Sequence, residues 1–130
     1  MATYLLDTSV IIDALNNKRG RRHLLLTLVI EGNLLACCPI NVSEVYAGLC
    51  PKEEAVTEEL LRSLEYYHLT WTVARMAGLL KRDYGRKGIM LGVADATIAA
   101  VALTYGLTLM TDNVKDFPMK ELALYPLPIR

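Results

Sequence analysis

Short apolar segments that alternate with helical patterns constrain the fold of this chain more than any other feature. The apolar segments lack polar–apolar alternation, which is typical of strands covered on both faces of a parallel sheet. They occupy residues 4–6, 34–38, 67–69, 107–110 and 123–127, of which the third is weak and the last is expected at an edge. Helical patterns lie between them, at residues 10–15 (capped by Thr8 or Ser9), 21–31, 41 to 48 or 49, 53–64, 70 or 72 to 84, and 92–105. The sequence therefore predicts an α/β fold.

Length and composition indicate one domain, over residues 1–130, with room for a single core. The apolar share of 53% and the mean hydropathy of +0.28 are high, so we expect a second subunit or a partner to cover some apolar surface. The longest nearly apolar run, 89–103, contains Asp95 and is shorter than the roughly 18–20 residues that a bilayer requires. Asp7 lies where a secretory signal would have to begin. We expect a cytoplasmic protein that does not enter a membrane.

The charges balance, with 14 Lys and Arg against 14 Asp and Glu, which gives no general attraction to nucleic acid. A polyanion would have to be held by a metal ion and by a local basic patch. The densest patches are 18–23 and 81–87, and each is also the pattern of an ordinary solvated helix face. The three cysteines, Cys37, Cys38 and Cys50, lack the spacing of zinc ligands, and we expect buried free thiols.

Acidic residues stand where the predicted strands end. Asp7 ends the first strand, Asp112 follows the strand at 107–110, and Asp116 comes four residues later. Glu44 lies in the first turn of the helix after the second strand, and Asp95 interrupts a helix that is otherwise almost wholly apolar. Because the carboxyl ends of parallel strands share one edge, where ligands bind, we expect these side chains to converge.

Each acidic residue also has an ordinary structural interpretation. Glu44, three residues after Asn41, is placed to complete a capping box. Asp7 and Asp95 are placed to stabilise helix starts, and the two late aspartates are typical of turns.

Taken together, the carboxylates predict a metal site. Charges of one sign that are crowded at an apolar edge repel one another, and a divalent cation removes this repulsion. Oxygen ligands without His or Cys favour Mg²⁺ or Mn²⁺ over zinc. Such a site is suited to metal-assisted attack of water on a phosphodiester, although nothing in the pattern selects RNA over other substrates.

Four segments carry a more specific signal. They read Leu5-Leu-Asp-Thr-Ser-Val-Ile-Ile-Asp13, Asn41-Val-Ser-Glu-Val-Tyr-Ala-Gly48, Val93-Ala-Asp-Ala-Thr-Ile-Ala-Ala100 and Leu109-Met-Thr-Asp-Asn-Val-Lys-Asp-Phe117. In this order they resemble the motifs of PIN-domain nucleases, specifically the VapC-type toxins of toxin–antitoxin pairs. The resemblance implies a three-layer α/β/α fold with a central parallel sheet of four to five strands, and a Mg²⁺- or Mn²⁺-dependent endoribonuclease acting on RNA.

The resemblance also implies site residues. Asp7 and Asp95 match metal ligands, Glu44 matches an acid that binds metal or orients the attacking water, and Ser9 matches a small hydroxyl near the site.

The fourth acidic position is ambiguous. The family pattern usually reads Thr-Arg-Asn before the final Asp-Phe, whereas this chain has Thr111-Asp112-Asn113 before Asp116. Either Asp112 or Asp116 therefore completes the site, with Thr111 and Asn113 as polar neighbours.

The resemblance implies partners as well, namely a second copy in a homodimer and a VapB-type antitoxin that wraps the toxin and blocks its site. Contact residues could come from an apolar set for which core packing is the other interpretation, namely Tyr46, Leu49, Leu60, Leu64 and Tyr67.

Other functions use similar residues. A housekeeping RNA-processing PIN protein or a structure-specific DNA nuclease would share the metal site. An aspartate-phosphorylated signalling domain needs two adjacent acids near the first strand and a lysine after a late strand, but Asp7 stands alone and Lys115 lies in a predicted loop. An inactive PIN-like binding module would usually lack one acidic position. We favour the nuclease.

Overall fold

A central sheet of parallel strands organises the computed structural model, which describes residues 1–48 and 53–127. The sheet order is β3-β2-β1-β4-β5, and every pair of neighbours is parallel. β1 is central, because Leu5 pairs with Ala36 on one side and with Leu109 on the other. The strands are β1 (Thr3–Leu6), β2 (Leu34–Cys37), β3 (Glu65–Tyr66), β4 (Thr108–Met110) and β5 (Leu124–Tyr125). The predicted α/β class and parallel sheet are confirmed.

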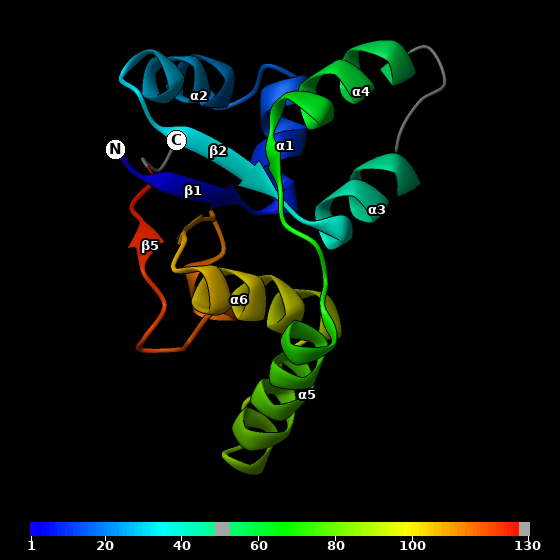
Figure 1. Ribbon diagram of the computed structural model, residues 1–130, viewed down its shortest axis with the longest axis vertical. Coiled ribbons are helices and arrows are strands. Elements are labelled where there is room, and N and C mark those ends of the chain that lie inside the picture. The colour runs from blue at the N-terminus through cyan, green and yellow to red at the C-terminus, as the bar shows by residue number, and fades with distance from the viewer. Residues whose placement is uncertain (49–52, 128–130) are drawn as a thin grey trace.

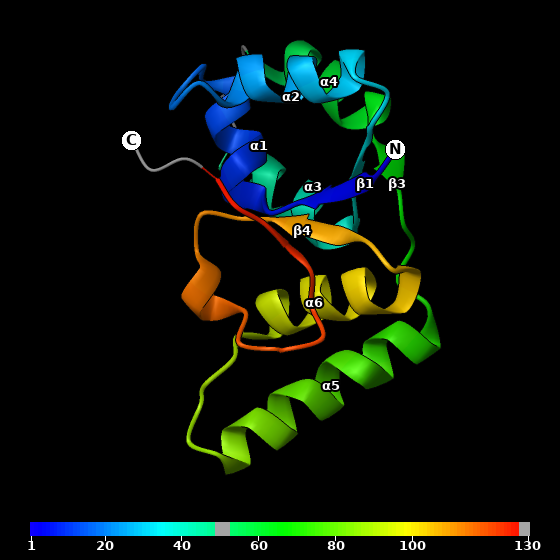
Figure 2. The same ribbon diagram turned by 90° about the vertical axis from the view of Figure 1, so that its left-hand side faces the viewer.

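Helices cover both faces of this sheet and give the predicted three layers (Figure 1). In Figure 2, α1, α2 and α4 lie above the strands, and α6 lies below them with α5 packed on its outer side. The helices are α1 (Thr8–Leu15), α2 (Arg21–Ile30), α3 (Pro39–Ala47), α4 (Glu54–Ser63), α5 (Trp71–Arg86) and α6 (Val93–Tyr105), with a 3₁₀ turn η2 (Val114–Asp116). In the described residues, no helix is long and apolar enough to cross a membrane.

Two apolar cores lie on the two faces of the sheet. Successive side chains of a strand point to opposite faces, so Leu5 packs toward α6 while Leu6 packs toward α1. α6 is buried continuously from Ala96 to Ala102, as its all-round apolar pattern predicts. Core packing is confirmed for the described residues of the proposed contact set: Leu64 is buried, Tyr46, Leu60 and Tyr67 pack against the cores, and Leu49 lies outside the described residues.

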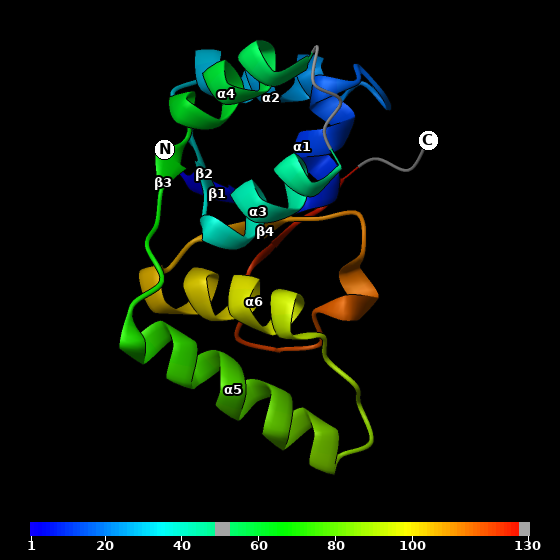
Figure 3. The ribbon, with the colours of Figure 1, turned by 90° about the vertical axis from the view of Figure 1, so that its right-hand side faces the viewer.

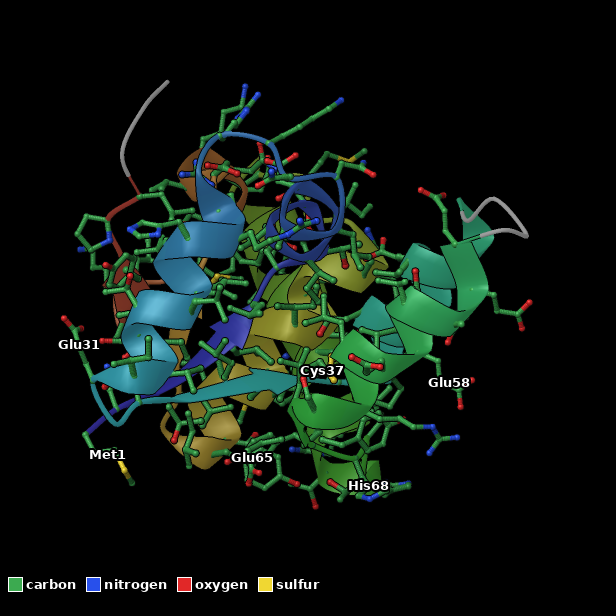
Figure 4. All side chains as sticks on the ribbon, turned by 90° about the horizontal axis from the view of Figure 1, so that it is seen from above. Met1, Glu31, Cys37, Glu58, Glu65 and His68 are labelled. Atoms are coloured by element: carbon green, nitrogen blue, oxygen red, sulfur yellow. The ribbon has the colours of Figure 1, made fainter. Side chains whose placement is uncertain are left out.

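Three local predictions differ from the structure. α1 is capped by Asp7, whose side chain accepts a hydrogen bond from the backbone of Thr8, rather than by Thr8 or Ser9. α3 begins at Pro39, where the fixed φ of proline suits the first helical position. β3 lies at residues 65–66 rather than 67–69, because only Glu65 and Tyr66 pair with β2. In the view from above (Figure 4), Cys37 of β2 lies inward, while Glu31 and Glu58 project outward.

Candidate active site

Asp7 is held rigidly at the carboxyl end of β1. Its backbone N–H donates to the carbonyl of Met110 at 2.9 Å, which extends the pairing of β1 with β4. Its Oδ1 accepts from the backbone N–H of Thr8 at 2.9 Å, and its Oδ2 accepts from the Thr111 hydroxyl at 2.7 Å. The residue is only 6% exposed. Each carboxylate oxygen has a second lone pair, so both can still bind a cation.

Glu44 reaches the same edge from α3. Its Oε1 accepts a hydrogen bond from the Thr8 hydroxyl at 2.6 Å, and that hydroxyl accepts one from the Asn41 amide at 3.1 Å. The capping-box interpretation of Glu44 is wrong. Asn41 instead accepts from the backbone N–H of Cys38 at 2.8 Å, because a helix that begins at Pro39 has Asn41 as its third residue.

Asp95 and Asp116 complete a cluster of four carboxylates. Asp95 lies in the first turn of α6, and Asp116 ends η2; both are half-buried. Burial, together with the charges of Asp7, Asp116 and Glu44, raises the pKa of Asp95 to about 6. Burial also raises the pKa of Asp7, against its hydrogen bonds with Thr111 and Thr8, and Glu44 and Asp116 add to the rise. Figure 3 faces this edge, with the starts of α1 and α6, η2 and α3 around it.

Asp112 stands apart from the cluster. Its Oδ1 lies 2.5 Å from Nη2 of Arg21, whose side chain is only 2% exposed. Arg19 lies 4.0 Å from the other oxygen of Asp112. Of the two aspartates that the sequence left open, Asp116 interacts with the other carboxylates, and Asp112 is engaged in an ion pair. The interpretation of 18–23 as a solvated face is wrong for Arg21.

The predicted polar neighbours lie beside Asp7. Thr111 is 1% exposed, and its hydroxyl accepts from the backbone N–H of Asn113 at 2.9 Å while it donates to Asp7. Asn113 thus supports the Thr111 hydroxyl through its backbone N–H. The Ser9 hydroxyl is buried and has no hydrogen-bond partner among the described residues. Sequence reasoning missed the hydrogen bonds of Thr8 and Asn41 to the site, although both are polar residues within the acidic motifs.

The donors at this edge are carboxylate and hydroxyl oxygens, which are the ligands of a hard divalent cation. As the side chains stand, no three His, Cys, Asp or Glu in residues 1–48 and 53–127 could hold a metal ion. Cys37 and Cys38 are buried free thiols, as predicted, and Cys50 lies outside the described residues. Burial raises the pKa of Cys37 to about 11, so the thiol stays protonated at neutral pH in the metal-free protein.

Known proteins resemble this chain over nearly its whole length. The PIN domain family model matches residues 4–120. Ribonuclease VapC19 of Mycobacterium tuberculosis is 30% identical over 115 residues, 88% of this chain and 92% of the relative. Ribonuclease VapC10 of the same organism is 32% identical over 125 residues, 96% of this chain and 93% of the relative.

Solved structures agree with the sequence relatives. The crystal structure of VapBC2 from Rickettsia felis, bound to a DNA fragment from its promoter, superposes with a TM-score of 0.83 at 25% identity, covering 95% of this chain and 97% of the other. VapC ribonucleases with a PIN domain generally depend on a divalent metal ion. The motifs, the parallel sheet and the matched relatives lead to one conclusion: this chain belongs to the PIN domain family, among the VapC ribonucleases.

Proposed function

We propose that this protein is a Mg²⁺- or Mn²⁺-dependent endoribonuclease that acts as the toxin of a VapBC-type toxin–antitoxin pair, as a single PIN-like domain over residues 1–130. The observation that carries the proposal is the interaction of Asp7, Glu44, Asp95 and Asp116 at one edge of the sheet. Burial raises the pKa of Asp7 and Asp95, and the charges of Glu44 and Asp116 add to both rises, which is unfavourable for folding. This arrangement of carboxylates is typical of a site that binds a cation.

The residues present fit such a cation. Asp7 and Asp95 would be its principal ligands, and Asp116 would complete the set. Repelling carboxylates stand apart until a cation draws them together, and Mg²⁺ needs few direct protein ligands because it keeps several waters. The unpartnered Ser9 hydroxyl offers a further polar contact. When bound, the ion neutralises charge on the phosphate oxygens and lowers the pKa of water.

The side chains around the cluster have distinct tasks in this proposal. Thr111 and the backbone of Thr8 fix both oxygens of Asp7, so the carboxylate does not have to reorganise during the reaction. The Thr8 hydroxyl occupies Oε1 of Glu44. Oε2 of Glu44 remains to accept a hydrogen bond from the attacking water and to direct it toward phosphorus. Asp112, engaged with Arg21, is assigned no ligand role.

The toxin role rests on relatives and on an exposed surface. The matched complexes pair a VapC-like chain with an antitoxin. In this chain a groove of about 580 Å³ lies between α2 and α4, lined by apolar side chains that include Leu26, Val29 and Val56, which are at least half exposed. We assign this groove to a VapB-type antitoxin. A homodimer that acts on RNA in the cytoplasm completes the proposal.

RNA cleavage by the purified protein tests the proposal. We expect cleavage of an RNA hairpin with Mg²⁺ or Mn²⁺, none in EDTA, and none of a DNA strand of the same sequence. Asp7→Asn and Asp95→Asn should each lower the rate at least about a hundredfold, because each removes a charge that holds the ion. Asp83→Asn, on the exposed side of α5, is the matched control and should cleave like the wild type.

Two results would contradict the nuclease. One is cleavage that persists in EDTA, and the other is undiminished cleavage in both active-site variants. For the toxin role, co-expression with the product of a short neighbouring reading frame should abolish cleavage by the wild type. If the protein cleaves RNA but no such product binds it, the result would favour a housekeeping RNA-processing nuclease over a toxin.

A further inference from the structure

We propose that Arg19 binds a phosphate of the RNA next to the one that is cleaved. This inference rests on the proposed function and deepens it. The arginine belongs to the loop 16–20 between α1 and α2, outside the four acidic motifs. Its role would be substrate binding rather than chemistry, because no carboxylate of the cluster contacts it.

Arg19 lies beside the active-site edge. Its Nη1 is 4.0 Å from Oδ2 of Asp112, and Asp112 directly follows Thr111, whose hydroxyl holds Asp7. Its Nε is 3.9 Å from Oδ2 of Asp13, which is one helical turn after Ser9 on α1. The guanidinium of Arg19 thus lies near two aspartates whose neighbours in the chain belong to this edge.

The guanidinium of Arg19 is available to a ligand. Its side chain is 53% exposed, and both of its ion-pair distances exceed the length of a hydrogen bond. The neighbouring arginines are already used: Arg21 is buried against Asp112, and Arg22 donates to the carbonyls at the end of α1 at 3.1 and 2.9 Å. Of the three arginines in this patch, Arg19 is the one that can receive a phosphate without breaking a short contact.

The charge of the site makes such a group necessary. A chain with no net charge does not attract RNA as a whole, and the edge itself carries four carboxylates. A metal ion offsets the charge of the carboxylates at the scissile phosphate. The flanking phosphates would still be repelled by these carboxylates. A guanidinium binds two phosphate oxygens at once, which suits Arg better than Lys for this position.

The backbone of the loop supports a specific role. Asn17 and Arg19 have φ of 53° and 56°, a left-handed conformation that asparagine tolerates but arginine rarely adopts. Residues held in a strained backbone conformation cluster at functional sites, including those that clamp a ligand. Arg19→Gly would relieve the strain while removing the guanidinium. Stability and RNA binding should then change in opposite directions.

Fluorescence anisotropy with a labelled RNA hairpin, in EDTA and at several salt concentrations, tests the inference. We expect Arg19→Gly to weaken binding about three- to tenfold and to reduce the slope of log K against log[salt] by about 0.7–0.9, the value for one lost phosphate contact. Its melting temperature should equal or exceed that of the wild type. Arg19→Lys should retain the salt slope and lose part of the affinity. In cleavage assays, KM should rise and kcat should change less than about twofold.

The matched control is Arg75→Gln. Arg75 is also exposed, and it lies in the half of α5 that starts at Trp71, at the opposite corner of the molecule from the loop 16–20 in Figures 2 and 3. A salt slope in Arg19→Gly equal to that of the wild type would overturn the inference while leaving the nuclease intact. An equal loss in Arg75→Gln would overturn it too. A wild type that neither binds nor cuts RNA would overturn both proposals.

Discussion

Replacing Asp95 by asparagine should stabilise the metal-free protein, although the residue is proposed as a metal ligand. The carboxyl group has its pKa raised from 3.8 to about 6 by burial and by the charges of Asp7, Asp116 and Glu44. Its charged form is therefore disfavoured in the folded state at neutral pH. Asparagine keeps the shape and the hydrogen-bonding capacity without the charge.

The magnitude follows from the pKa. A rise from 3.8 to about 6 corresponds to about 3 kcal/mol for a fully shielded group. Asp95 is only half-buried, so solvent screening reduces this to about 1 kcal/mol. With an unfolding entropy of about 2.1 cal/mol/K per residue over the chain, this gain raises the melting temperature by about 4 °C.

The pH dependence provides an internal check. Between pH 3.8 and about 6 the folded state holds a proton on Asp95 that the unfolded state releases, so the free energy of unfolding falls as pH rises through this window. The gain from Asp95→Asn should be complete at pH 7.5 and should shrink as the pH falls through this window toward 3.8. A gain that stayed constant with pH would have another origin.

Thermal unfolding followed by circular dichroism, in EDTA and in Mg²⁺ or Mn²⁺, measures the effect. Metal at a hundred times its Kd should stabilise the wild type by about 2.7 kcal/mol and Asp95→Asn very little, so the order of stability should reverse. The control Asp83→Asn should stay within about 2 °C of the wild type in every buffer. Two results would refute this prediction. One is a melting temperature of Asp95→Asn below that of the wild type in EDTA at pH 7.5, and the other is a metal-induced rise as large as that of the wild type.

Three further predictions use the same assays. Asp116→Asn should lose the metal-induced rise in melting temperature, whereas Asp112→Asn should keep it; the opposite pattern would exchange their roles. Arg21→Met should lower the free energy of unfolding in urea by about 3 kcal/mol, because it removes the short ion pair of the largely buried Asp112 and leaves only Arg19 at 4.0 Å. Thr111→Val should reduce cleavage at least about tenfold with the fold retained, and Thr111→Ser should restore it, because the hydroxyl orients Asp7; equal rates in the two variants would contradict this.

Local pattern was sufficient to predict most of the fold. The strands β1, β2 and β4 and the helix α6 were predictable because most of their residues are apolar, as expected of elements that are buried on more than one side. The edge strand β3 was predicted two residues late. Its two residues are exposed, and only their pairing with Ala36 and Cys37 defines the strand. The pairing of a strand with a distant neighbour cannot be predicted from a local apolar pattern.

The sequence predicted that acidic residues gather at one edge of the sheet, but it did not predict their contacts. The acidic residues at strand ends pointed to one edge, since parallel strands end together. The capping-box interpretation of Glu44 failed because it placed the helix start at Asn41, whereas α3 begins two residues earlier at Pro39. The choice between Asp112 and Asp116 depended on Arg21, which is 91 positions from Asp112 in the chain. A contact between residues so far apart in the chain cannot be predicted from local sequence patterns.

The pair of Arg21 and Asp112 also explains why the cluster has four carboxylates rather than five. Asp112 is the next residue after Thr111, which contacts Asp7, so a free charge there would add to the repulsion that already raises the pKa of Asp7 and Asp95. A buried ion pair of this kind gives little net stability, because desolvation offsets its attraction. Its effect is on the site: Arg21 offsets the charge of the extra aspartate, which leaves Asp7, Glu44, Asp95 and Asp116 as the carboxylates of the proposed cation site.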